Sequence, residues 1–398
     1  MPKAVIFLGD GMADEPLPEL GGKTPLEAAK TPAMDAIAAE GASGTFLTLP
    51  EGLPTTSDVA NMSVLGFAPE RNYPGRGPIE AASQGIELAP DDVAWRCNLV
   101  TVSPDGVLLD YSAGHIGNAA SSRLMNLLQE KLGSDKATFY PGVSYRNLLV
   151  LHGKEFSPQV DYFKPDSSQN IPVAELPLTA KTPEAEETVG FVKNLCTRAH
   201  EVLKDAGVPG ATDIWPWSPG KKPELPSFEK LYGGRKGAVI SAVDVIRGIG
   251  RASGMTVAEV PGVTGFLDTN YAGKVSAALE MLKNHDLVYI HLEAVDECSH
   301  MGDLKLKLRA IEEFDSRIVA PVRRVLAGQE VNFAVLPDHP VPVHLRQHTT
   351  TPVPVAMCGP DFAPDGIQVF SETQAPCGAL GALRGGDIVR RLLGLKKS

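Results

Sequence analysis

Several features are missing from this 398-residue sequence, and each absence narrows the class of protein. No apolar run approaches the ~20 residues that a membrane-spanning helix needs. The stretch MPKAVIFLGDGM reaches a polar GDG too early for a signal peptide, so we expect a first strand there. The five cysteines are scattered without a C-x-x-C pair, which is typical of a reduced, cytoplasmic protein.

Clusters of lysine and arginine are also missing, and the formal net charge is −11. Nucleic acid is therefore not an expected partner, because a phosphate backbone requires clustered basic residues. An acidic protein still binds an anionic substrate when metal ions or a few local basic residues set the charge of its pocket. We expect a small anionic metabolite rather than a macromolecule or a membrane.

The chain is too long for one ordinary core, and its pattern indicates two domains. Apolar runs that end in a polar residue predict strands buried on both faces, as in a mostly parallel α/β sheet covered by helices. These runs occupy residues 4–10, 237–244, 287–296, 331–339 and 352–359. Helical spacing follows at 272–285 and at 303–328, where we expect Pro321 to bend the helix.

The middle of the chain is different and predicts an inserted α+β domain. Short strand-like pieces alternate with helical stretches at 118–133 and 185–207, before a Pro- and Trp-rich stretch, 214–228, that reads as a loop. The predicted boundaries lie in the Gly- and Pro-rich joins. We therefore assign residues 1–82 and 228–398 to a discontinuous main domain, and residues 83–227 to the inserted domain.

Acidic residues and histidines gather where the predicted strands end. The side chains concerned are those of Asp10, Asp296, His300, Asp338, His339 and, in a later loop, His348. In open α/β sheets, ligands bind at the carboxyl ends of the strands, so these side chains should converge at one edge. A mixed Asp and His set favours Zn, Mn or Fe over Mg or Ca. The sequence thus predicts a metal site.

The stretch TTSD supplies three hydroxyl groups, those of Thr55, Thr56 and Ser57, without a nearby histidine base. A hydroxyl beside a divalent ion has a lowered pKa and becomes a nucleophile without such a base. The chain has no G-x-x-x-x-G-K-[ST] motif, so phosphate binding would depend on the metals. These features favour phosphoryl transfer through one of the three hydroxyls.

Longer motifs make the chain similar to a known family. The stretches that carry the likeness include GDGMAD (9–14), SDVANMSVLG (57–66), GRGPIEAASQGIEL (75–88), PGVTGFLDTNYAGK (261–274), HLEAVDECSHMGD (291–303) and PDHPVPVHLRQHTTTPVPV (337–355). They resemble the archaeal-type cofactor-independent phosphoglycerate mutases of the alkaline phosphatase superfamily. The resemblance covers essentially the whole chain and implies an alkaline-phosphatase-like sheet.

This resemblance implies a site with two divalent ions, Mn or Zn, of which Mn is favoured. Asp296, His300 and His348 would hold one ion. The second ion would be held by Asp10, Ser57, Asp338 and His339. Ser57 aligns with the family nucleophile, with Thr55 and Thr56 as minor alternatives. The implied reaction interconverts 3-phosphoglycerate and 2-phosphoglycerate through a phosphoserine, with the inserted domain as a lid.

The resemblance also suggests three residues for binding the substrate, namely His115, Arg146 and Lys274. Arg76 is interpreted as structural and His344 as an ordinary loop histidine. Because the lid must move, we expect a monomer.

Two stretches depart from the mutase pattern. IWPWSPGKKP (214–223) carries no arginine where archaeal mutases have an arginine-bearing segment, and KPDSSQN (164–170) replaces a loop with histidine and aspartate. The Trp-Pro-Trp version resembles a bacterial subgroup proposed to be homoserine kinases. A homoserine kinase and a metal-dependent phosphatase therefore stay open as alternatives that use the same serine and metals.

Overall fold

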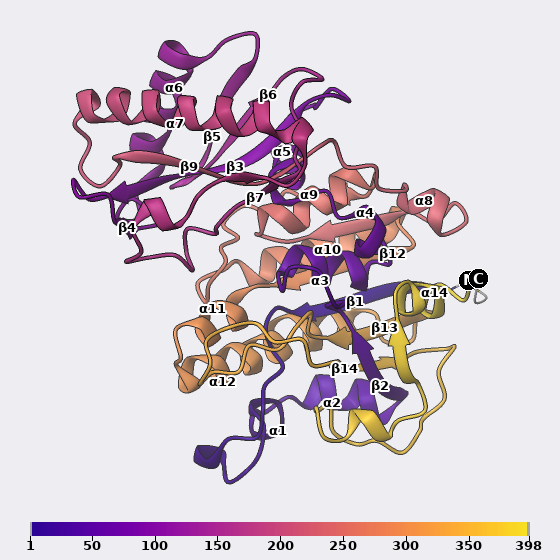
Figure 1. The fold of residues 1–398 in the computed structure, drawn as a ribbon. Helices are drawn as coiled ribbons and strands as arrows, with labels where there is room; N and C mark the ends of the chain where they lie inside the picture. The colour runs from indigo at the N-terminus through magenta and orange to yellow at the C-terminus, as the bar shows by residue number, and fades with distance from the viewer. Residues whose placement is uncertain (1, 396–398) are drawn as a thin grey trace. The chain divides into compact units, whose positions relative to one another are not determined.

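The computed structural model describes residues 2–395. The chain divides into two compact units (Figure 1). Unit 1 comprises Met1–Tyr73 and Leu225–Ser398, and unit 2 comprises Pro74–Glu224. Over the described residues, the structure contains no helix long and apolar enough to cross a membrane.

Unit 1 is built on an eight-stranded sheet with the order β11-β10-β12-β1-β13-β14-β2-β15. The strands are β1 (Lys3–Gly9), β2 (Ala42–Leu47), β10 (Gly237–Ile240), β11 (Thr256–Val257), β12 (Leu287–Leu292), β13 (Val331–Leu336), β14 (Val353–Cys358) and β15 (Gly381–Arg384). Neighbours from β11 to β13 are parallel, whereas β14 is antiparallel to both β13 and β2. The predicted mostly parallel α/β sheet is confirmed.

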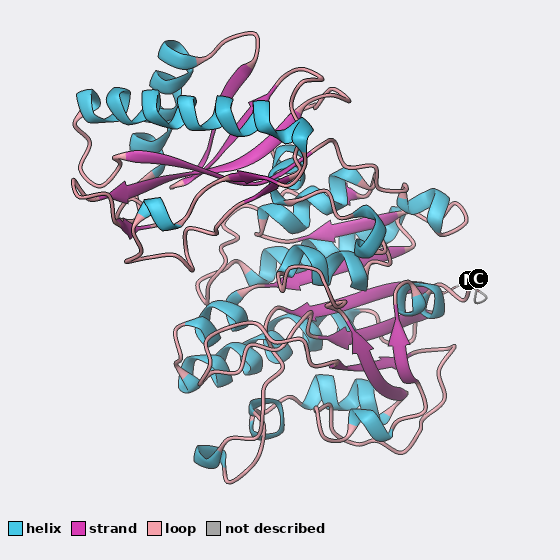
Figure 2. Ribbon diagram, in the orientation of Figure 1, coloured by secondary structure: helices cyan, strands magenta, loops and turns pink. Residues whose placement is uncertain are grey.

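Helices pack against this sheet because its central strands are apolar on both faces (Figure 2). The longer ones are α2 (Pro32–Ala39), α3 (Ser57–Val64), α9 (Asp244–Ala252), α10 (Tyr271–Asn284), α11 (Ala294–His300), α12 (Leu304–Phe314), α13 (Ala320–Val325) and α14 (Asp387–Leu392). On one face, Val5 and Phe7 of β1 share a core with Ile37 of α2, Ala278 of α10 and Ile311 of α12. Burial of such side chains contributes roughly 1.5–3 kcal/mol each.

The helix predicted over 303–328 is continuous but changes its winding. Between α12 and α13 lies a π-helical segment, η4, at Asp315–Val319. Pro321 follows in the first turn of α13, where its missing N–H group and its ring disturb the regular hydrogen bonds. The helix thus continues past the proline, as expected, with a local widening just before it. Asp315 in this segment accepts a 2.7 Å hydrogen bond from the Met34 backbone N–H, which fixes α2.

Unit 2 is an α+β unit with its own sheet and core. The strands are β3 (Val93–Val102), β4 (Leu108–Asp110), β5 (Ala137–Val143), β6 (Arg146–Leu151) and β9 (Asp213–Gly220), and β7 (Val160–Asp161) pairs with β8 (Thr179–Ala180). Helices α6 (Asn118–Leu132) and α7 (Glu186–Ala206) cover one face of the larger sheet (Figure 1). Trp95, Leu99, Leu128 and Val192 lie in the core between them.

The structure differs from the sequence-based expectation at two places in unit 2. Helix α5 (Arg76–Ser83), which we expected in the main domain, belongs to unit 2. Its Gly77 lies against the β3 backbone, where an added Cβ would be 2.3 Å from the Ala94 carbonyl oxygen. The stretch DIWPWSPG, expected as a loop, forms β9. Among the described strands it pairs only with β3, and an edge strand tolerates the missing N–H groups of Pro216 and Pro219.

The turn between α2 and β2 leads to a first prediction, on stability. A Cβ added at Gly41 would lie 1.9 Å from the Met357 carbonyl oxygen in β14. We expect Gly41→Ala to lower the thermal midpoint of unfolding by roughly 4–8 °C, because neighbouring backbone must shift. The control is Gly190→Ala in α7, where nothing lies within 4 Å of the new methyl group. It should raise the midpoint slightly. Calorimetry that finds the two variants equally stable would contradict this account.

Candidate metal centre and nucleophile

The polar residues predicted at the strand ends do meet at one edge of the unit 1 sheet. Asp10 follows β1, Asp296 lies in the first turn of α11 after β12, and Asp338 with His339 follows β13. Strand β1 lies between the other two in parallel register, with Gly9 paired to Leu292 and Leu8 to Leu336. Because β12, β1 and β13 are paired in parallel and in register, their carboxyl ends lie at the same level along the sheet.

Asp296, His300 and His348 form the first donor set. Asp296 and His300 are four residues apart in α11, and His300 Nε2 lies 3.4 Å from Asp296 Oδ2. His348 Nε2 lies 3.5 Å from Asp296 Oδ1 and 3.0 Å from His300 Nε2. The other ring nitrogen of His300, Nδ1, donates a 2.9 Å hydrogen bond to the Arg346 carbonyl oxygen. That bond orients Nε2 toward the set.

Asp10, Asp338 and His339 form the second set, which is fully buried. His339 Nε2 lies 3.3 Å from Asp10 Oδ1 and 3.4 Å from Asp338 Oδ2. Ser57 Oγ lies 3.2 Å from the same nitrogen. The two sets adjoin, because the His339 and His348 rings stack with their centroids 3.8 Å apart. All seven residues of the predicted metal and nucleophile site are therefore brought together.

The backbone holds the second set in place at Gly11 and His339. Asp338 Oδ1 accepts hydrogen bonds from the Gly11 N–H at 3.1 Å and from the His339 N–H at 2.9 Å. Gly11 has a φ of +63°, and a Cβ there would be 2.7 Å from Asp296 Oδ1. Only glycine therefore fits this approach of the β1 loop to both carboxylates.

Burial and mutual repulsion perturb the titration of these groups. Burial, followed by the charges of Asp338 and Asp296, raises the pKa of Asp10 well above its usual value. Burial also raises the pKa of Asp338 to about 7 and lowers the pKa of His339 well below its usual value. Burial would raise the pKa of Asp296 too, but hydrogen bonds from His300 and His348 hold it well below its usual range. The raised pKa values of Asp10 and Asp338 show that the described residues do little to stabilise their ionised forms, which a bound cation would favour.

The donor sets fit divalent cations. Each offers one nitrogen or oxygen atom per residue, and within each set these atoms lie within 4.8 Å of one another. Asp10 Oδ1 is buried and has no hydrogen-bond partner among the described residues, which is costly unless a cation pairs with it. Nitrogen and carboxylate donors suit Zn or Mn.

Ser57 begins helix α3 and faces this cluster. Its Oγ is the only TTSD hydroxyl with a recorded contact to either donor set in the described chain. The polar side chain of Asn61, one turn later in α3, donates 2.8 Å hydrogen bonds to the Ser57 carbonyl oxygen and to Asp338 Oδ2. The helix therefore fixes the serine and a carboxylate of the second set to each other.

Sequence reasoning missed three residues of the site. Asn61 is one, and Tyr289 of β12 is another, because its hydroxyl donates to Asn61 Oδ1. The third is His291 of β12, whose Nε2 lies 3.1 Å from Asp10 Oδ2. Burial lowers the pKa of His291 to about 3. In the sequence, Tyr289 and His291 stand out as polar residues in a strand that is otherwise apolar. They are two positions apart, so both side chains lie on the same face of the strand, the face toward α3.

Of the three predicted substrate-binding residues, two lie in unit 2 and one lies in unit 1. His115 and Arg146 lie in unit 2 around Tyr145, with the His115 ring centroid 6.3 Å and the Arg146 guanidinium carbon 5.5 Å from that ring. Both are exposed. Lys274 lies in unit 1, is 1% exposed and donates a 2.7 Å hydrogen bond to the His291 carbonyl oxygen.

Unit 2 also contains a buried cationic cluster around Glu80. Arg76 Nε lies 2.7 Å from Glu80 Oε1, and Arg96 Nη1 pairs with the same oxygen. The guanidinium carbons of Arg76 and Arg96 lie 5.8 Å and 5.5 Å from the Trp217 ring centroid. Burial would raise the pKa of Glu80, but Arg96 and then Arg76 hold it below its usual value. Arg76 thus has the structural contacts expected for it.

Comparison with known proteins places the fold and the site in a class. A family model described as 2,3-bisphosphoglycerate-independent phosphoglycerate mutase matches residues 38–208. A solved structure of a cofactor-independent phosphoglycerate mutase from Thermoplasma acidophilum is 26% identical, with a TM-score of 0.65 over 99% of both chains. The PH0037 protein of Pyrococcus horikoshii is 27% identical, with a TM-score of 0.83 over 100% of this chain and 98% of its own. The class is that of the cofactor-independent phosphoglycerate mutases.

Curated relatives narrow this class to one family. A 2,3-bisphosphoglycerate-independent phosphoglycerate mutase of Methanosarcina acetivorans is 44% identical over 98% of this chain and 99% of its own. A probable enzyme of the same name from Geobacter sulfurreducens is 46% identical over 94% of this chain and 95% of its own. The chain belongs to the 2,3-bisphosphoglycerate-independent phosphoglycerate mutase family, which implies divalent metal ions.

The two donor sets lead to a prediction on metal content. We expect the wild-type chain, after dialysis against Mn²⁺, to retain two ions, as the two sets suggest. His348→Ala should retain one, because the first set loses a donor. The control is His344→Ala, whose ring is half exposed and lies 3.9 Å from Glu15. Elemental analysis should find both ions in that control. Equal metal content in the two variants would contradict the assignment of His348.

Proposed function

We propose that this protein interconverts 3-phosphoglycerate and 2-phosphoglycerate by phosphoryl transfer through Ser57. The observation that carries the proposal is the position of Ser57 Oγ, 3.2 Å from His339 Nε2 of the second donor set. Without cations, the carboxylates around Ser57 would repel an anionic phosphate group, and the hydroxyl could not react with it. With them, it becomes a nucleophile placed where a phosphate ester would be held.

Each donor set has an assigned task in this proposal. Asp296, His300 and His348 would hold one divalent ion. The second ion would be held by Asp10, Asp338, His339 and Ser57. When bound, the ions would offset the charge of the phosphoryl group and lower the pKa of the Ser57 hydroxyl. Mn is the favoured metal, and Zn is the alternative.

The chemistry consists of two displacements at phosphorus. Ser57 Oγ forms a bond to phosphorus as the bond to one glycerate oxygen breaks, and that oxygen takes up a proton in balance with the one lost by Ser57. The glycerate then turns, and its other hydroxyl oxygen forms a bond to phosphorus as the bond from phosphorus to Ser57 Oγ breaks, with Ser57 Oγ taking up a proton in balance with the one lost by that hydroxyl. Asn61 keeps Ser57 and Asp338 in register through its two 2.8 Å hydrogen bonds during both steps.

Water must be kept from the phosphoserine, since hydrolysis would turn the mutase into a phosphatase. We assign this task to unit 2 as a closing lid, hinged at the joins 72–78 and 221–226. Its exposed Arg146 guanidinium and the ring nitrogens of His115 are suited to hydrogen bonding with the carboxylate of the glycerate. Lys274 stays a prediction as a substrate contact, because its amine is buried against the His291 carbonyl oxygen.

The alternatives use the same nucleophile and metals. A homoserine kinase would require ATP, and a phosphatase would release phosphate. The names of the curated relatives favour the mutase over both. We further propose that the protein acts as a monomer in the cytoplasm, in line with its glycolytic substrate and the need for the lid to move.

The role of Ser57 is tested by a matched pair of variants in TTSD. Ser57→Ala should reduce mutase turnover by at least ~10³-fold, because the phosphoryl acceptor is removed. Thr55→Ala, at an exposed neighbour, should stay within about threefold of wild type. Metal content measured in parallel should stay unchanged for Thr55→Ala and largely unchanged for Ser57→Ala. Turnover that survives in Ser57→Ala would show that water or a threonine is the nucleophile.

The reaction itself is tested by phosphorus NMR. Mn-loaded protein is incubated with 3-phosphoglycerate in one tube and with homoserine plus ATP in another. We expect 2-phosphoglycerate in the first, with little free phosphate, and unchanged ATP in the second. Phosphohomoserine without 2-phosphoglycerate would establish the kinase instead, and free phosphate as the main product would establish a phosphatase.

A further inference from the structure

Helix α12 carries a lysine on its buried face. Lys307 lies on this face together with Ala310 and Phe314, at helical spacing. Its side chain is fully buried, although lysine is almost never buried unless it is paired. Lys305, two positions earlier in the same helix, is exposed. A buried charge at position 307 therefore requires specific partners.

The ammonium group of Lys307 contacts two loops at once. Its Nζ donates hydrogen bonds to Asp14 Oδ2 at 2.7 Å and to the Val341 carbonyl oxygen at 2.8 Å, and a longer one to the Ala13 carbonyl oxygen at 3.4 Å. These acceptors match the three N–H donors of an ammonium group. Ala13 and Asp14 follow β1, and Val341 follows β13. Lys307 thus joins the two loops that carry the second donor set.

The two loops also contact each other at this point. The Val341 N–H donates a 3.1 Å hydrogen bond to the Ala13 carbonyl oxygen, and the Val343 N–H donates a 3.0 Å hydrogen bond to Asp14 Oδ2. Ala13 also forms an isolated bridge with Pro340. The lysine ammonium group therefore lies at the junction of the two loops.

The residues of the second donor set are close to this junction along the chain. Asp10 precedes Ala13 in the loop after β1, and His339 precedes Val341 in the loop after β13. Groups that orient metal ligands from behind affect metal affinity nearly as much as the ligands themselves. A shift of either loop would change the separation of the ligand atoms, so whatever joins the loops should affect metal binding.

Stability alone does not account for a lysine at this position. A buried ion pair is often no more stabilising than apolar residues of the same volume. Asp14, the charged partner of Lys307, is 6% exposed. Its backbone N–H donates a 2.9 Å hydrogen bond to Glu372 Oε1, and its Oδ1 accepts a 2.7 Å hydrogen bond from the Glu15 N–H. The pair is therefore tied to the surrounding chain on both sides, as a positioning role requires.

We propose that Lys307 is a positioning residue for the second donor set. Its ammonium group holds the loops after β1 and β13 at the separation at which that set binds one divalent ion. This role rests on the metal site proposed for Ser57, and it is the same whichever hydroxyl accepts the phosphoryl group. Because Lys307 acts through the backbone of the two loops, metal affinity should respond to its loss.

The test isolates the second set by removing a donor of the first. In a His348→Ala background, metal-free protein is titrated with Mn²⁺ by calorimetry, and we expect one ion per chain. Adding Lys307→Met should weaken this binding about tenfold, as is typical for residues that orient metal ligands. The matched control is Lys305→Met in the same background, at the exposed lysine of the same helix. It should leave the dissociation constant unchanged.

A double variant separates positioning from folding stability. Lys307→Met leaves Asp14 buried without its charged partner and should lower the thermal midpoint of unfolding. Asp14→Asn combined with Lys307→Met removes both charges and should recover most of that loss. In the His348→Ala background, its Mn²⁺ affinity should stay as low as with Lys307→Met alone, because the loops are still not joined. Circular dichroism checks that each variant is folded.

The first donor set provides a second control. Asp338→Asn removes a donor of the second set and leaves Asp296, His300 and His348 intact. In that background, Lys307→Met should leave the affinity for Mn²⁺ unchanged, because the lysine joins the loops of the second set.

Four results would overturn the proposal: equal Mn²⁺ affinity with Lys305→Met and Lys307→Met, affinity that recovers together with the midpoint in the double variant, an equal loss of affinity at the first set, or no Mn²⁺ binding in the His348→Ala background. These titrations contain no substrate. If Ser57→Ala kept its turnover while Lys307→Met weakened Mn²⁺ binding, the reaction proposed for Ser57 would fail and the role of Lys307 would stand.

Discussion

Buried negative charge at the end of three parallel strands is the constraint that organises this molecule. Asp10, Asp296 and Asp338 are each at most 7% exposed, and the pKa of Asp10 is raised by burial and by its carboxylate neighbours. Such a cluster opposes folding unless cations neutralise it. Burial would lower the pKa of His300, but its hydrogen bond with Asp296 raises it to about 9, so Asp296 is compensated within the protein. Asp10 and Asp338 have raised pKa values instead, and their site is suited to a divalent ion.

The surrounding structure holds this cluster together against its own repulsion. Parallel register brings the strand ends level, Gly11 allows the β1 loop to approach Asp296 closely, and backbone N–H groups of Gly11 and His339 fix Asp338. Asn61 then ties the cluster to Ser57. Phosphoryl transfer through a serine depends on this arrangement, since a nucleophile displaced by a fraction of an ångström loses much of its advantage.

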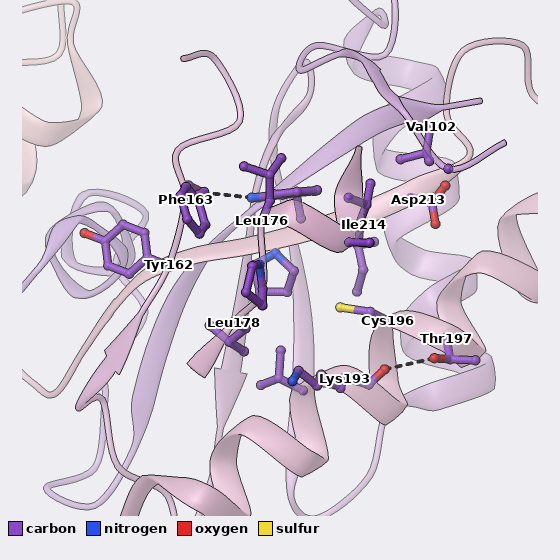
Figure 3. Close-up of a pocket in the computed structure, with 17 residues that line it drawn as sticks. Val102, Tyr162, Phe163, Leu176, Leu178, Lys193, Cys196, Thr197, Asp213 and Ile214 are labelled. Atoms are coloured by element: carbon purple, nitrogen blue, oxygen red, sulfur yellow. Dashed lines mark hydrogen bonds between the residues drawn. The ribbon is translucent and has the colours of Figure 1, made fainter. Parts of the chain in front are cut away.

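The sheet of unit 2 borders both a charged cluster and an apolar pocket. Strand β9 contributes Trp217 to the arginines around Glu80 and, two residues earlier, Trp215 to the apolar pocket. The pocket beside Trp215 is lined mostly by apolar residues, among them Leu176 and Leu178 (Figure 3), whereas the cluster around Glu80 is charged.

The sequence by itself determined the parallel α/β framework and the residues that meet at its edge. Apolar runs ending in Asp or His are local patterns, and strand ends converge in any such sheet. Three things needed the tertiary structure: the strand at DIWPWSPG, where pairing with β3 overrides two prolines; the joining of α5 to unit 2; and the partners Asn61, Tyr289 and His291. Each depends on contacts between residues far apart in the chain. The periodicity of a sequence does not indicate which distant groups will be in contact.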